Sequence, residues 1–235
     1  MHVIRVLVLF FLSLLLCACH PVHHLSWTEE MATKIHLYGP SSRLSFIPYF
    51  QRANIPYPPK HLAILVFKDT MSMQIYAREN AGWKFIRTFS ILAASGTAGP
   101  KLHEGDDQVP EGIYHIIGMN PESHFLLSLQ LNYPNDFDRF YAQVDNRANL
   151  GGDIFIHGNK RSIGCVAIGN ENIEKLFPLV YEVGISNVKV IIAPNDFRIA
   201  SPDYPAGMPS WTPILYDKLN EALSRFPSPS YAVSL

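Results

Sequence analysis

The sequence predicts a β-rich α+β domain, and two observations support this class. The first is a series of short runs rich in β-branched and aromatic residues and separated by turn-forming residues, which is typical of strands. The second is a pair of amphipathic patterns, between Asn170 and Gly184 and over residues 214–226, which predict helices packed on a sheet. The expected strands cover residues 61–67, 71–78, 84–92, 112–119, 125–131, 153–158, 165–169 and 188–194.

The first expected strands have the clearest signals. Residues 61–67 form the apolar run HLAILVF, and residues 71–78 alternate apolar and polar side chains, as a strand with one buried face does. A hairpin-sized link over 79–83 joins that strand to the next. No internal repeat is evident.

The later elements follow in order. Two short apolar runs, DIFIHG and CVAIG, predict strands on either side of a seven-residue turn over 158–164. Asn170 is the expected N-cap of the first helix, with Glu171 in its first turn and Gly184 at its end.

Length and composition predict one main domain with an ordinary core. The chain has 235 residues, of which 48% are hydrophobic and 17% are charged. Its 19 lysine and arginine residues nearly balance its 20 acidic residues, and no basic run lies beside aromatic residues. We therefore expect no nucleic-acid partner.

The N-terminus predicts export. Arg5 precedes an apolar run over residues 6–16 that is short for a membrane span, so residues 1–19 are the expected secretory signal. The end of this segment resembles a lipobox, which makes Cys19 a candidate lipid anchor, although Cys17 takes a place usually filled by Ser, Thr or Ala. A cleaved signal without lipid and an uncleaved anchor are the alternatives. We expect the exported protein in the periplasm, held to the membrane by a lipid or signal anchor.

The rest of the chain divides into three expected segments. Residues 20–60, which are polar and proline-rich, predict a tether and an irregular lead-in. Residues 61–200 form the expected main domain, and residues 201–235 a helical extension packed on it.

The histidines predict no metal and no cofactor. Three histidines lie in the expected linker after the signal, and five further histidines along the chain do not pair at ligand spacing. These histidines are His20, His23, His24, His36, His61, His103, His115 and His124.

Cys165 is the one cysteine in the body of the chain, and an exported thiol without a partner is expected to be buried or used. His157 ends one expected strand and Cys165 begins the next, so a hairpin or neighbouring strands can bring a base to the thiol. Lys160, Arg161 and the following helix N-terminus are expected to lower the thiol pKa. The spacing permits a catalytic pair and does not demand one, because Cys165 can also be a small buried hydrophobic residue.

Two blocks of the sequence resemble the L,D-transpeptidase (YkuD) catalytic domain family. The first is His157-Gly158 followed by Ser162-Ile163-Gly164-Cys165, which is similar to the family's HG…SxGC signature. The second is GTAGPK (96–101), GD (105–106) and VPEGIY (109–114), which is most like the YafK branch. The resemblance covers about residues 62–196 and implies a β-sandwich or barrel with a few flanking helices.

The resemblance also implies roles. Cys165 would attack the carbonyl of meso-diaminopimelate in a peptidoglycan stem peptide, and His157, oriented by the carbonyl of Gly158, would act as base. Ser162 and Gly164 would shape the turn and the oxyanion hole.

One position departs from the family pattern. Many members place an arginine two residues after the cysteine, where this chain has Ala167. The residue that binds the substrate carboxylate is therefore open, with Lys101, Arg139 and Arg161 as candidates by charge.

The resemblance leaves two reactions and one other class of protein open. Members of the YafK branch use water and release wall-attached lipoprotein, whereas other members use an amine to form 3-3 cross-links or to attach protein to peptidoglycan. A non-catalytic wall-binding lipoprotein is the alternative of another class. A papain-like hydrolase is excluded, because no histidine follows Cys165.

Overall fold

The computed structural model of the chain describes residues 26–80, 82–204 and 206–228. The expected signal over 1–19, Cys19 and the first three histidines lie outside these residues. The strands are β1 (His61–Phe67), β2 (Ser72–Arg78), β3 (Lys84–Ser90), β4 (Ala93–Ala94), β5 (Gly112–Ser123), β6 (Leu126–Leu131), β7 (Phe155–His157), β8 (Val166–Ala167) and β9 (Val188–Ala193). The helices are α1 (Trp27–Ala53), α2 (Asp136–Val144), α3 (Asn170–Val183), the 3-10 helix η1 (Ile185–Asn187) and α4 (Thr212–Leu223).

Within the described residues the strands form one nine-stranded sheet in the order β3-β2-β1-β9-β5-β6-β7-β8-β4. The pairs β1–β9 and β7–β8 are parallel and the other pairs are antiparallel. The long strand β5 pairs with β9 through residues 112–115 and with β6 through residues 116–123, so it joins the two halves of the sheet. The predicted β-rich α+β class is confirmed.

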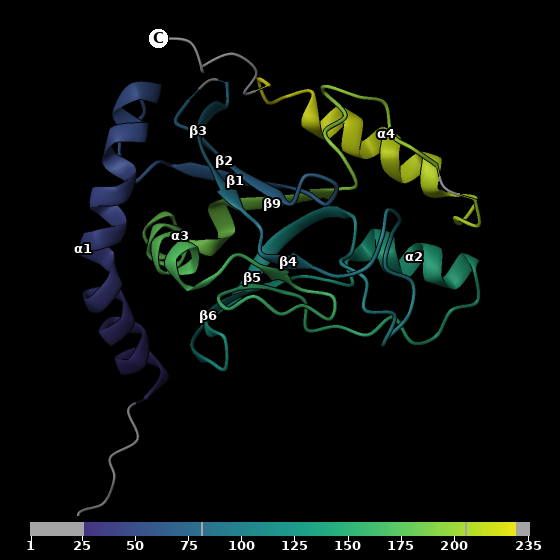
Figure 1. Cartoon of the computed structure of the whole chain (residues 1–235), viewed down its shortest axis with the longest axis horizontal. Helices are drawn as coiled ribbons and strands as arrows, with labels where there is room; N and C mark the ends of the chain where they lie inside the picture. The colour runs from purple at the N-terminus through teal and green to yellow at the C-terminus, as the bar shows by residue number, and fades with distance from the viewer. Residues whose placement is uncertain (1–25, 81, 205, 229–235) are drawn as a thin grey trace, which may run out of the picture.

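Helices cover both faces of the first half of the sheet (Figure 1), with α1 and α3 on one side and α4 on the other. Strand β1 shows the consequence, because its alternate side chains enter two different cores. Leu62, Ile64 and Val66 pack toward α1 and α3, whereas Ala63, Leu65 and Phe67 pack toward α4. A strand covered on both faces reads as a continuous apolar run, which is why HLAILVF lacks alternation.

The expected irregular lead-in over 20–60 is wrong for residues 27–53, which form helix α1. Its pattern is hard to detect, because it contains Pro40 and Pro48 and buries only a narrow stripe that includes Phe46 and Phe50. Burying those two rings stabilises the fold by about 2 kcal/mol each. The capping box that begins the helix at Ser26 was the available signal.

A buried ion pair links the sheet to α4. Lys68 Nζ lies 3.0 Å from Glu111 Oε1 and also donates to the carbonyls of Gly99 and Val109. The second oxygen of Glu111 accepts the hydroxyl hydrogen of Tyr216 on α4 at 2.9 Å. All the polar atoms of this carboxylate are therefore paired, which a buried charge requires.

Candidate functional site

The predicted pair lies at the junction of β7 and β8. These strands run parallel and adjacent, with His157 opposite Ala167, so the neighbouring-strand alternative holds and the hairpin does not. Cys165 lies directly before β8, at the end of the turn that follows His157. Both side chains line one cleft of about 650 Å³. The tertiary structure thus brings the candidate base and the candidate nucleophile together.

Cys165 is a half-buried thiol, and its Sγ lies 3.7 Å from the carbonyl oxygen of Asp153. Burial raises its pKa above the ordinary value of 9.0, and the backbone N–H of Phe155 and the charge of Lys101 oppose this only in part. The expectation that the local potential lowers this pKa is therefore wrong. The reason is that desolvation penalises the thiolate more than the neighbouring positive charges stabilise it. At neutral pH the sulfur is a thiol that needs a base.

His157 is the base that the cleft offers. Its ring is 1% exposed and stacks on Phe125, with ring centroids 4.3 Å apart. Nδ1 lies 2.5 Å from the carbonyl oxygen of Gly158, so Nδ1–H donates to that carbonyl and Nε2 carries the lone pair. Burial lowers the pKa of His157 below its ordinary value of 6.5. Phe125 was missed by the sequence analysis, because nothing in its local pattern separates a stacking ring from an ordinary strand residue.

Gly158 is required for steric reasons. A Cβ on this residue would lie 2.4 Å from the carbonyl oxygen of Phe125 and 2.8 Å from Oδ1 of Asn170. That Oδ1 accepts the backbone N–H of Asn159 at 2.7 Å and so fixes the loop to the start of α3. Asn170 was the expected N-cap of this helix. In the structure it is the first residue of α3, and Gly169 is the N-cap.

Gly158→Ala is expected to destabilise the protein by about 1–3 kcal/mol, because the added Cβ must displace the backbone of Phe125. The matched control is Gly152→Ala, where a Cβ meets no atom within 4 Å. Urea unfolding of both variants checks this prediction. Equal stability of the two would show that the loop yields to the side chain at little cost.

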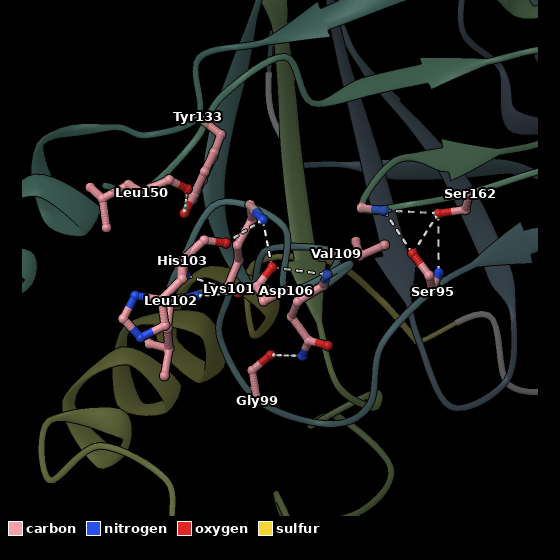
Figure 2. A network of polar contacts seen from close by, with 12 residues as sticks. Ser95, Gly99, Lys101, Leu102, His103, Asp106, Val109, Tyr133, Leu150 and Ser162 are labelled. Atoms are coloured by element: carbon pink, nitrogen blue, oxygen red, sulfur yellow. Dashed lines mark hydrogen bonds and ion pairs between the residues drawn. The ribbon is translucent and has the colours of Figure 1, made fainter. Parts of the chain in front are cut away.

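Ser162 and Gly164 belong to a hydroxyl network that fixes the turn, and Figure 2 shows Ser162 beside Ser95 in it. Ser162 Oγ donates to the carbonyl of Cys165 at 2.6 Å and lies 2.9 Å from Ser95 Oγ. The N–H of Gly164 donates to Ser95 Oγ at 2.7 Å. This N–H is already occupied, so the implied oxyanion role does not fit Gly164, whereas the implied turn-shaping role fits its φ of +113°. Ser95, which comes from the loop after β4, was not predicted from the sequence.

The three candidate carboxylate-binding residues differ in their position and in whether their charge is already paired. Lys101 lines the cleft, but its Nζ lies 2.5 Å from Asp106 and also donates to the carbonyl of His103, as Figure 2 shows. Arg139 lies on α2, outside the cleft lining, and pairs with Asp136 at 2.8 Å. Arg161 is exposed at the cleft, and within the described part of the chain no carboxylate lies in salt-bridge range of it. Arg161 is thus the cleft cation whose charge is not already paired.

The two pKa shifts predict a pH dependence of acylation. Because burial lowers the pKa of His157, we expect its neutral form to persist and the rate to fall on the acid side only below pH 6.5. Because burial raises the pKa of Cys165, we expect alkylation of this residue by iodoacetamide to increase with pH, with a midpoint above 9.0. Mass spectrometry of the Cys165 peptide measures the alkylation. A midpoint near pH 6 would instead indicate a preformed thiolate–imidazolium pair.

Over residues 26–80, 82–204 and 206–228, no cluster of three or more histidine, cysteine, aspartate or glutamate side chains is arranged to hold a metal ion. Within the same ranges, no helix has the length and apolar character needed to cross a membrane.

The model of the L,D-transpeptidase catalytic domain (YkuD) matches residues 62–192, which is more than half of the chain. The chain belongs to this family, and the resemblance that the sequence motifs indicated is confirmed.

Particular relatives refine this assignment. The chain is 29% identical over 119 residues to the protein named YafK of Escherichia coli K12. The match covers 50% of this chain and 46% of YafK, so the chain spans about half the length of the curated relatives it matches.

Solved structures with a similar fold include the helical cell shape determining protein Pgp2 of Campylobacter jejuni, with 19% identity and a TM-score of 0.48. That likeness covers 71% of this chain and 70% of the Pgp2 chain. Bd1075 of Bdellovibrio bacteriovorus has 23% identity and a TM-score of 0.44, over 70% of this chain and 55% of its own.

Proposed function

We propose that this chain is a thiol-dependent peptidoglycan enzyme that forms a thioester between Cys165 and the meso-diaminopimelate carbonyl of a stem peptide. The observation that carries the proposal is the shared cleft. The thiol lines this cleft together with a buried histidine whose Nδ1 is held by the carbonyl of Gly158. This arrangement leaves Nε2 as the proton acceptor, which a thiol with a raised pKa needs.

The proposed reaction has two halves. In the first, Nε2 of His157 takes the thiol proton, the sulfur attacks the carbonyl carbon, and the C–N bond to the leaving amine breaks. The imidazolium returns its proton to that amine. In the second half, water attacks the thioester and gives a proton to His157. The C–S bond then breaks, releasing the carboxylic acid, and Cys165 regains its proton.

Water is the proposed acceptor, which makes the enzyme a hydrolase that releases wall-attached lipoprotein or peptide. The resemblance of the GPK, GD and PEG blocks to the YafK branch supports this choice. Transpeptidation, which passes through the same thioester and uses an amine instead, is the second candidate. A wall-binding lipoprotein without activity is the third.

The charges around the cleft fit a zwitterionic substrate such as the free end of meso-diaminopimelate. Arg161 offers an unpaired guanidinium for a carboxylate, in the place of the family arginine that Ala167 replaces here. Asp107 and Asp153 line the same cleft and offer carboxylates for the substrate ammonium group.

The proposed setting is the periplasm, because peptidoglycan lies outside the cytoplasmic membrane and residues 1–19 resemble a secretory signal. Lipidation of Cys19 would hold the enzyme at the membrane beside the wall.

Incubation with tetrapeptide muropeptides, with and without a lysine-bearing acceptor, tests the proposed function. We expect a shortened stem peptide with a new free carboxylate, and no amide to the acceptor, as measured by liquid chromatography and mass spectrometry. An amide product would establish the transpeptidase reaction instead. Unchanged muropeptides and no adduct on Cys165 would favour the wall-binding alternative.

A further inference from the structure

A second hollow of about 530 Å³ lies between the sheet and α4, and no residue that lines it also lines the catalytic cleft. This volume is within the range of small-molecule sites. Its walls carry an unusual concentration of basic side chains. We call it the basic groove, defined by His61, Arg78, His115, Lys189, Lys218 and Arg225.

Strand register explains how distant residues gather in the groove. His61 on β1 is opposite Arg78 on β2, and Lys189 on β9 is opposite His115 on β5. Lys189 is also the partner of Ala63, which packs toward α4. Alternation along the strands therefore points the basic residues of four neighbouring strands to the α4 side. Helix α4 adds Lys218, and the turn that follows the helix adds Arg225.

The positive charges of the groove are poorly neutralised. Glu221 is the one acidic residue among those that line it, and it pairs with Arg225 at 2.7 Å. For Arg78, Lys189 and Lys218, no carboxylate of the described residues lies within salt-bridge distance. Burial, followed by the charges of Arg225 and Arg78, lowers the pKa of Lys189. Like charges held this close cost free energy while the groove is empty.

We propose that the basic groove binds a multiply charged phosphate group, separately from the catalytic cleft. The lysine and arginine side chains of the groove are Arg78, Lys189, Lys218 and Arg225. They favour a ligand with two or more negative charges close together, and a phosphate ester or diphosphate carries such charges in one compact group. The rings of Trp83 and Phe226, 5.0 Å apart, also line the groove, and the Arg78 guanidinium lies 4.8 Å from the centre of the Trp83 ring. These rings offer an apolar surface to a carbon skeleton attached to the phosphate. A soluble phosphorylated molecule and a phospholipid headgroup share this chemistry.

Calorimetric titration of the full chain with pyrophosphate tests the proposal. We expect Lys189→Gln and Arg78→Gln each to weaken binding about tenfold, since each removes one charge-assisted contact. Lys34→Gln on α1, on the other side of the sheet, is the matched control and should bind as the parent does. Citrate is the contrast probe, because it carries comparable charge on carboxylates.

Vesicle sedimentation separates the two sources. Binding to phosphatidylcholine vesicles that requires added phosphatidylglycerol, and that both groove variants lose, assigns the groove to a headgroup. Pyrophosphate binding without vesicle binding assigns it to a soluble phosphate. No binding to either probe, binding that the variants leave unchanged, or equal affinity for citrate would overturn the proposal.

Stability of the ligand-free protein gives an independent readout. Lys189→Gln removes repulsion from Arg78 and Arg225, so we expect an unfolding temperature equal to or above that of the parent. A clear fall would identify Lys189 as a packing residue and would also overturn the proposal. None of these measurements depends on Cys165, so they can fail while the proposed function stands.

Discussion

Cys165→Ala is expected to abolish thioester formation and to lower turnover of muropeptides by at least about 10³-fold, since no other nucleophile replaces the thiol. The lost step is the attack of Sγ on the substrate carbonyl. Intact-mass spectrometry after incubation with a tetrapeptide muropeptide or a carbapenem measures the acyl adduct directly.

Two further variants make this result specific. His157→Ala keeps the thiol but removes the base, so we expect the adduct to form much more slowly at neutral pH and to recover in part as the pH rises toward the thiol pKa. Arg139→Ala, on α2 outside the cleft lining, should acylate at the parent rate. An adduct that persists in Cys165→Ala would place the nucleophile elsewhere and refute the mechanism.

Glu111→Ala is expected to lower the free energy of unfolding by about 3–5 kcal/mol, the largest stability effect that we anticipate. The substitution leaves the ammonium of Lys68 buried without its partner, and it removes the acceptors of Gly99 N–H and Tyr216 O–H. Urea unfolding followed by circular dichroism measures the loss.

Two controls show whether the cost comes from the uncompensated charge. Lys68→Met combined with Glu111→Leu removes both charges, so we expect it to be less destabilising than Glu111→Ala alone. Glu171→Ala removes an exposed partner of Lys175 and should change stability little. A double variant as unstable as Glu111→Ala would indicate that the hydrogen bonds, rather than the charge, dominate.

The sheet could largely be predicted from the sequence, because most strands carry strong local signals. Short apolar runs rich in β-branched residues, such as residues 62–67 and 190–193, favour buried strands. Helix α1 was missed, because tertiary packing on α3 sustains it against two internal prolines. Ser42 Oγ donates to the carbonyl of Lys175 at 2.6 Å, and Arg43 pairs with Glu182.

For the candidate site, the sequence by itself determined which residues are the candidate base and the candidate nucleophile, and the small residues between them. The order His157, Gly158, Gly164 and Cys165 is a local property, and the single cysteine in the body of the chain is a compositional one.

Only the tertiary structure decided how those residues behave. Whether a thiol pKa rises or falls depends on its burial against nearby charges, and here burial wins for Cys165. Packing also brought Phe125 onto the ring of His157, and Ser95 onto the turn at Ser162. The physical reason is that desolvation and hydrogen-bond competition act through space. Ser95 and Ser162 are 67 positions apart in the sequence, so their hydroxyl groups can form a hydrogen bond only once the chain has folded.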